Sequence, residues 1–347
     1  MASLIRSKAT WEGWPVPNEH DGDDDYRVVL DEQCLDWRLL SPDALSHTLD
    51  ALADLLEPIA DGRTTALMDL AYEVECLPSL KLAEALYSSR GGLPPDERRR
   101  LQLLLDKCRV LEPETADLPP QTRRNDGAWH ESSWGMAHAL ARGAEGRSMS
   151  CLVGPSSTSP DHCAGWPSGW LAVERDTGSL RQQVDVHLLR APDDLVSFWR
   201  AIFTREQVTP DRFFTLTESA FPRLLFASSL KFHHFRGKYT EILPWLVHLL
   251  GLLNDHFAEV LSSCGGDQKK VHDHFKALGA DISPESPNTK KNAKAWEQRT
   301  VLFQEERHRC EWHGKRLWDR DRVHFSLPLQ AHDGRVLIGI FTDHLDT

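Results

Sequence analysis

Histidine, lysine and arginine side chains are concentrated in one short segment near the C-terminus of the 347-residue chain. Residues 310–325 read CEWHGKRLWDRDRVHF and contain two histidines, one lysine and three arginines. An imidazole titrates near neutral pH and can transfer a proton, and lysine and arginine can stabilise negative charge on a phosphate. The composition of this segment therefore predicts a site for a phosphate ester.

Two predicted strands would bring these side chains onto one surface. His313 and Lys315 are two residues apart in the first strand, and Arg322 and His324 are two residues apart in the second, so each pair shares a face. If a short turn folds the strands together, neighbouring polar groups lie about 5 to 7 Å apart. His344, just beyond a third strand, can reach the same rim. The three strands are expected at 309–315, 320–327 and 335–342.

This arrangement contains the groups needed to cleave RNA through the ribose 2′-hydroxyl. One histidine would take the hydroxyl proton and another would protonate the leaving oxygen, steps that typically contribute about 10²–10⁴-fold. Lys315 and Arg322 would stabilise the charge that develops on the phosphate. We expect such a reaction to require no metal and no other cofactor.

The C-terminal segment also resembles the RelE/ParE/HigB-type toxins, which are small ribosome-dependent mRNA ribonucleases. The resemblance covers about sixty residues, in which a basic helix is followed by an arginine-led strand, DRVHF, and an apolar strand, GRVLIGIF. It implies catalytic or phosphate-binding roles for His313, Lys315, Arg322, His324 and His344. In this chain Asp343-His344-Leu345 stands where these toxins usually have a basic pair. The large region that precedes the toxin-like segment is also atypical of the family.

Other interpretations of the cluster stay open. A charged surface hairpin, with Arg320 or Arg322 paired to nearby acidic residues, would have the same sequence. His308, Cys310 and His313 offer three ligands that zinc accepts, but no second closely spaced pair completes the set. The alternative function is a non-catalytic interaction or scaffold subunit of a larger complex.

The rest of the chain predicts an α+β protein with three regions. These are an acidic helical region at 1–120, a mixed α/β and then helical region at 121–282, and a helix plus antiparallel β-meander at 283–347. Helices are expected at 64–76 and 289–306. An aromatic-rich stretch around Phe198 to Phe226 is interpreted as core, with partner docking as the alternative.

Charge and composition limit the classes of partner. The chain carries a net charge of −12, which argues against non-specific coating of nucleic acid, but residues 288–325 contain ten basic and six acidic residues. The seven cysteines are scattered, and the apolar run 242–253 is too short to cross a bilayer. We expect a cytoplasmic toxin-like ribonuclease or RNA-binding protein. Its expected partners are RNA or a ribosome, and a protein docked on the helical or aromatic-rich regions. A role in bacterial anti-phage defence would fit this interpretation.

Overall fold

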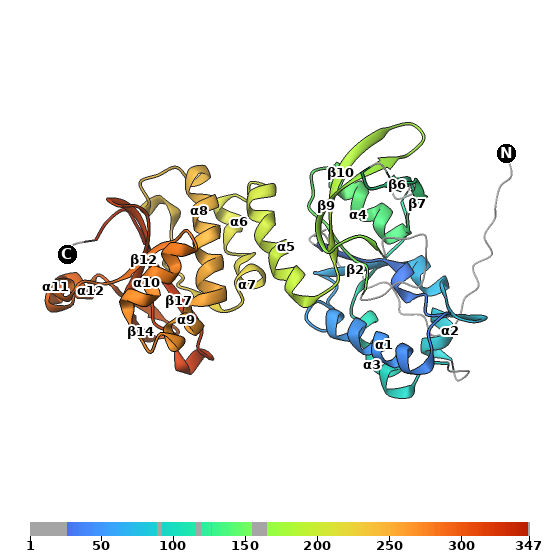
Figure 1. Ribbon diagram of the computed structural model, residues 1–347, viewed down its shortest axis with the longest axis horizontal. Coiled ribbons are helices and arrows are strands. Elements are labelled where there is room, and N and C mark those ends of the chain that lie inside the picture. The colour runs from blue at the N-terminus through green and yellow to red at the C-terminus, as the bar shows by residue number, and fades with distance from the viewer. Residues whose placement is uncertain (1–25, 89–91, 115–118, 126, 155–164, 346–347) are drawn as a thin grey trace. The chain divides into compact units, whose positions relative to one another are not determined.

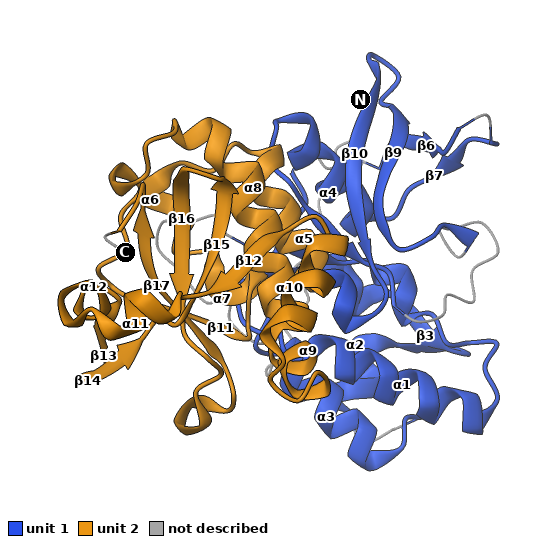
Figure 2. Ribbon diagram, turned by 60° about the vertical axis from the view of Figure 1, so that its left-hand side comes forward, with its two compact units in different colours: residues 1–195 blue, residues 196–347 orange. Residues whose placement is uncertain are grey.

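The computed structural model describes residues 26–88, 92–114, 119–125, 127–154 and 165–345, and the chain divides into two compact units, residues 1–195 and 196–347 (Figure 2). Helices and sheets occur in both units, and the C-terminal strands are antiparallel, so the predicted α+β class is confirmed. The predicted region boundaries at 120 and 282 differ from this division. Strands on both sides of each boundary belong to one sheet, which joins the regions that they were expected to separate.

A mixed eight-stranded sheet forms the centre of unit 1, in the order β5-β2-β1-β8-β10-β9-β6-β7 (Figure 1). The strands from β5 to β10 run parallel to their neighbours, and β9, β6 and β7 are added antiparallel. The strand bounds are β1 Val28–Leu30, β2 Thr65–Met68, β5 Arg109–Leu111, β6 Gln121–Arg123, β7 His130–Glu131, β8 Ser150–Leu152, β9 Gly169–Asp176 and β10 Arg181–Leu189.

Helices cover both faces of this sheet. One core joins Val28 and Leu30 of β1 to α1 and α3, and a second joins Val29 to α4. Residues 64–76, predicted to be helical, instead form β2, a 3₁₀ turn and β3, because a short apolar run buried on both faces has no periodicity that distinguishes it from a helix. The remaining elements are α1 Pro42–Leu56, β3 Glu75–Leu77, β4 Leu80–Lys81, α2 Leu82–Tyr87, α3 Pro95–Leu105 and α4 Trp134–Ala144.

Unit 2 is built on a five-stranded sheet in the order β11-β17-β16-β15-β12, whose strands lie side by side in Figure 2. β11 is parallel to β17, and all the other neighbours are antiparallel. The three predicted C-terminal strands are therefore confirmed. The strand bounds are β11 Leu224–Phe226, β12 Asp281–Pro284, β15 Trp312–Leu317, β16 Arg320–Phe325 and β17 Val336–Thr342.

Helices pack on the apolar face of this sheet. Phe257, in a π-helical turn that follows α8, contacts Trp312 of β15 and Phe325 of β16 at ring-centroid distances of 5.4 and 5.0 Å. At Gly314 any Cβ would lie 2.6 Å from Leu249 of α8, so the strand and the helix approach closely. The helices are α5 Pro192–Arg205, which spans the boundary between the units, α6 Pro210–Phe213, α7 Thr217–Ala220, α8 Tyr239–Leu252, α9 Ala258–Ser263 and α10 Gln268–Ala277.

The aromatic-rich region forms part of this core. Phe198, Phe203, Phe213 and Phe221 are fully buried. The ring of Phe203 lies 4.8 Å from that of Phe213 and 5.8 Å from that of Phe221. The prediction of core packing is confirmed for these four residues, which leaves them unavailable to a docked partner. Across the described parts of the chain, every helix is too short or too polar to reach through a lipid bilayer.

The segment that follows β12 contains two short helices and two strands, so the prediction of one helix at 289–306 is wrong. Asn292 ends the first short helix and caps the second through its side chain, and Gln304 and Glu305 have φ angles of 49° and 67° that turn the chain sharply between two strands. These local signals override the helical spacing of the apolar residues. The segment consists of α11 Pro287–Lys291, α12 Ala293–Glu297, β13 Thr300–Phe303 and β14 Glu306–Arg309.

Candidate functional site

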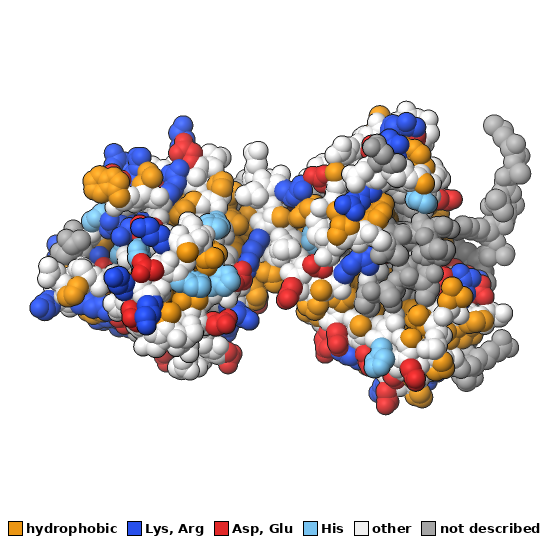
Figure 3. Space-filling model, viewed as in Figure 1, with side chains coloured by type: hydrophobic (Ala, Val, Ile, Leu, Met, Phe, Trp, Pro, Cys, Tyr) orange, Lys and Arg blue, Asp and Glu red, His pale blue; other side chains and the backbone are white. Residues whose placement is uncertain are grey.

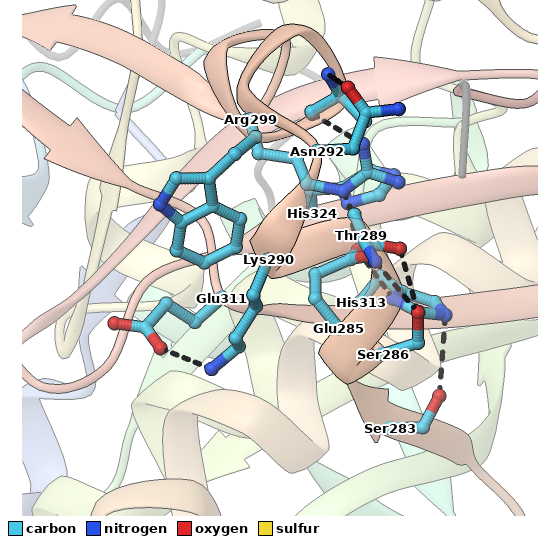
Figure 4. A network of polar contacts seen from close by, with 12 residues as sticks. Ser283, Glu285, Ser286, Thr289, Lys290, Asn292, Arg299, Glu311, His313 and His324 are labelled. Carbon is cyan, nitrogen blue, oxygen red and sulfur yellow. Dashed lines mark hydrogen bonds and ion pairs between the residues drawn. The ribbon is translucent and has the colours of Figure 1, made fainter.

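Strand register brings the predicted polar residues into two adjacent rows. His313 of β15 lies directly opposite His324 of β16, and Lys315 lies directly opposite Arg322. On the other side of β15, the edge strand β12 places Ser283 opposite His313. β12 is followed directly by Glu285, whose carboxylate reaches the histidine row (Figure 4).

Glu285 connects the two histidines to a buried arginine. Its Oε1 lies 2.8 Å from His313 Nδ1 and 3.1 Å from His324 Nδ1. Its Oε2 lies 2.8 Å from Arg299 Nε, and Arg299 Nη1 donates to the carbonyl of Ala295 at 2.7 Å. Because Glu285 precedes α11 and Arg299 follows α12, these contacts fasten the segment 287–309 to the sheet.

The cluster is enclosed by protein. His324 has no exposed surface, and Arg299, Glu285 and His313 are 1%, 5% and 8% exposed. The side of the sheet expected to present its polar row to solvent is therefore covered at this end. The prediction of a 289–306 helix gave no reason to expect that cover.

Burial and charge set the ionisation of the cluster. Burial lowers the pKa of His313, and it lowers the pKa of His324 to about 4, so the folded protein favours neutral imidazoles. Burial alone would raise the pKa of Glu285, but interactions with His313 and His324, hydrogen bonding first, outweigh it and hold that pKa well below its usual range. The cluster thus contains an anionic carboxylate beside two imidazoles.

The remaining predicted residues lie outside this enclosure. Lys315 and Arg322 are half-buried and form the next row toward the β15–β16 turn. Burial lowers the pKa of Arg322, and its Nη2 reaches the carbonyl of Trp318 at 3.5 Å. His344 is exposed after the end of β17. The structure therefore pairs four of the five predicted residues but separates them into a buried row and a half-buried row, with His344 apart from both.

Glu285, Arg299 and Ser283 are the residues of this cluster that the sequence interpretation missed. Glu285 stands between two prolines in the stretch SPESP, which indicates only a break between elements. Arg299 falls within the helix predicted at 289–306, which gave no reason to place it beside the histidines. One signal could have indicated Glu285: its carboxylate comes immediately after a strand that pairs with the histidine-bearing strand.

The donor atoms also test the metal alternative. Among the described residues, Glu285, His313 and His324 are the group whose potential ligand atoms all lie within 4.8 Å of one another. The alternative set of His308, Cys310 and His313 is not brought together in this way. Cys310 is buried, and burial raises the pKa of its thiol to about 12, so it would remain protonated.

Comparisons of this chain with protein-family models, curated proteins and solved structures gave no match. The function of the site is therefore inferred from its residues and their geometry.

Proposed function

We propose that unit 2 binds single-stranded RNA through the tip of the β15–β16 hairpin. The observation that carries this proposal is Trp318, which lies in the turn of the hairpin and is 85% exposed. An indole ring so exposed presents its face to solvent beside basic side chains, and every nucleobase has a face that can stack on such a ring. The proposal thus assigns Trp318 as the stacking platform.

Basic residues stand behind this tryptophan in strand register. Lys315 and Arg322 face each other across the strands, and Arg320 lies opposite Leu317. Such groups attract a phosphate backbone without selecting its sequence. The neighbouring Asp321 is fully buried and accepts from the backbone N–H groups of Arg236 and Gly237 at 2.8 and 3.1 Å.

The attraction would be local and modest. In Figure 3 the basic side chains of unit 2 are interspersed with acidic ones on the face in view, and Asp281 lies directly opposite Lys315 on β12. With three cationic contacts to a single strand, the logarithm of affinity should fall with the logarithm of salt concentration with a slope of about −2. That slope distinguishes local binding from coating by a wholly basic surface.

The enclosure of His313 and His324 favours RNA binding over the toxin-like cleavage suggested by the RelE-type resemblance. A general acid or base must come within hydrogen-bond reach of the proton that it transfers. Both imidazoles instead contact Glu285 inside the protein. We therefore expect the full-length chain to bind RNA without cutting it.

Fluorescence anisotropy with a labelled single-stranded RNA tests this proposal. Trp318→Ala should weaken binding by about 5- to 150-fold, because stacking contributes about 1–3 kcal/mol per base. The double variant Lys315→Ala, Arg322→Ala should weaken binding further and flatten the salt slope. Lys269→Ala, Lys270→Ala removes two exposed charges from α10 and serves as the matched control.

The outcomes separate the candidate functions. Folded wild-type protein that does not bind RNA would contradict the proposal and favour the scaffold subunit. Binding that is equally weakened by the α10 control would also contradict it. Cleavage of the RNA that is abolished by His324→Gln would replace binding with the ribonuclease function.

A further inference from the structure

Three donor atoms from separate strands or strand ends converge on one point in unit 2. Glu285 Oε1 lies 2.8 Å from His313 Nδ1 and 3.1 Å from His324 Nδ1, and the three ligand atoms fit within 4.8 Å of one another (Figure 4). Ligands bound to one zinc ion at about 2.0–2.2 Å are separated by about 3.3 Å in a tetrahedral site. Small shifts would therefore place an ion among these atoms.

The surrounding contacts orient the donors as a metal site requires. Arg299 holds Oε2 of Glu285, which leaves Oε1 as the oxygen directed at the histidines. Ser283 Oγ lies 3.2 Å from His313 Nε2, the ring nitrogen that faces away from Glu285. Metal-binding histidines are usually held through their second nitrogen in this way.

His324 supplies an independent observation. Its ring is completely buried, Nε2 has no hydrogen-bond partner among the described residues, and Nδ1, which faces the site, has only its ion-pair contact with Glu285. An imidazole placed in an enclosed site without full hydrogen bonding is costly unless another interaction compensates. Coordination of an ion by Nδ1 would provide such an interaction.

We propose that Glu285, His313 and His324 bind a divalent transition-metal ion, with zinc as the first ion to test. Two imidazoles and a carboxylate are donors that zinc and ferrous iron accept, whereas calcium and magnesium favour oxygen ligands. Because the guanidinium of Arg299 already pairs with Glu285, the affinity for the metal ion should be lower than in a site without this arginine. Bound metal would fasten the segment 287–309 to the sheet, and this role is independent of RNA binding.

Metal binding can be measured on the full-length protein. The protein is treated with EDTA, transferred to buffer without chelator and titrated with Zn²⁺ while its thermal unfolding is followed. Co²⁺ is then added to a separate sample to obtain a visible spectrum of the coordination sphere. We expect one tight equivalent of zinc, a raised unfolding temperature, and a cobalt spectrum without a thiolate charge-transfer band.

Two kinds of variant assign the ion to these residues. His324→Gln should abolish the tight equivalent, and Ser283→Ala, which leaves all three ligands in place, should weaken zinc binding by about 10- to 100-fold. Ser262→Ala, at an exposed position of α9, and His308→Ala, outside the cluster, are the matched controls and should bind as wild type does.

The proposal is overturned if folded wild-type protein shows neither tight zinc binding nor a change in unfolding temperature. It is also overturned if the His308 control loses the ion while Ser283→Ala keeps full affinity. Should His324→Gln fail to fold, the wild-type titration and the Ser283→Ala comparison still decide the result. RNA binding is tested separately, at Trp318, so a failure to bind RNA would leave the zinc result unaffected.

Discussion

Among the described residues, each unit has one buried glutamate near a helix start, and the two carboxylates have opposite surroundings. Glu32 of unit 1 accepts from the backbone N–H groups of Trp134 and Gly135 at the start of α4, at 2.5 and 2.9 Å. Burial and the neighbouring Asp31 raise its pKa to about 7. Burial would raise the pKa of Glu285 in unit 2, but interactions with His313 and His324, hydrogen bonding first, hold it well below the usual range.

The comparison shows that burial does not by itself decide the charge of an enclosed acid. Hydrogen bonds from two backbone amides are insufficient to keep Glu32 ionised beside another acid, whereas hydrogen bonding to two imidazoles keeps Glu285 anionic. An anionic carboxylate next to neutral imidazoles can receive a cation. Glu32, which takes up a proton near neutral pH, instead lies where the end of β1 packs closely against the start of α4. At this contact a Cβ on Gly135 would lie 2.3 Å from the carbonyl oxygen of Leu30.

The largest expected effect is from Glu285→Gln. The substitution leaves the Arg299 guanidinium, which is 1% exposed, without its carboxylate, and breaking a buried ion pair typically costs about 3–5 kcal/mol. Urea denaturation measures the loss in the free energy of unfolding. Glu311→Gln is the control because its partner, Lys290, is 34% exposed and the pair is worth less than about 1 kcal/mol. Equal losses in both variants would break the contrast between buried and surface pairs.

Acid should destabilise unit 2. The unfolded chain protonates His324 near pH 6.5 and the folded chain near pH 4, so stability is lost as the pH falls through this window. The loss should reach about 3 kcal/mol. Glu285 acts in the same direction below pH 4.5, since its pKa is lowered on folding. Calorimetry in EDTA measures the effect, and a unit 2 transition that does not move between pH 7 and 4 would contradict it.

Unit 1 should respond in the opposite direction. Folding raises the pKa of Glu32 from 4.5 to about 7, so the unfolded state loses its proton first and stability falls as the pH rises through this range. Glu32→Gln, which resembles the protonated acid, should gain about 2 kcal/mol on the wild type between pH 5 and pH 8. Stability curves for the two proteins that stay parallel between these pH values would show that Glu32 is ionised throughout.

A surface charge cluster in unit 1 should matter least. Arg100 of α3 lies 2.7 Å from Asp54 and 2.6 Å from Glu57, but those acids are 65% and 67% exposed. Exposed pairs are screened by water and salt and contribute about 0.2–1 kcal/mol. Arg100→Ala should therefore change the free energy of unfolding by less than about 1 kcal/mol in urea denaturation. A loss as large as that of Glu285→Gln would mean that exposure does not distinguish these pairs.

The sequence predicted the pairing of the site residues better than their environment. Alternation along the strands correctly placed His313 with Lys315 and Arg322 with His324, and a short turn brought the rows together. The enclosure could not be predicted because it depends on the segment 287–309, whose caps and sharp turn override its helical spacing. Glu285 lies 28 residues before His313, so their contact depends on strand order and not on local pattern.

The most direct test of the central claim is the ionisation of the two glutamates in one protein. Carbon-13 NMR of side-chain carboxyls in the metal-free, glutamate-labelled chain reports each titration, and the signals are assigned with Glu32→Gln and Glu285→Gln. Glu32 should titrate near pH 7 while Glu285 stays ionised across the whole range in which the chain remains folded. Protonation of Glu285 above pH 5, or a Glu32 carboxylate that stays ionised down to that pH, would contradict the account.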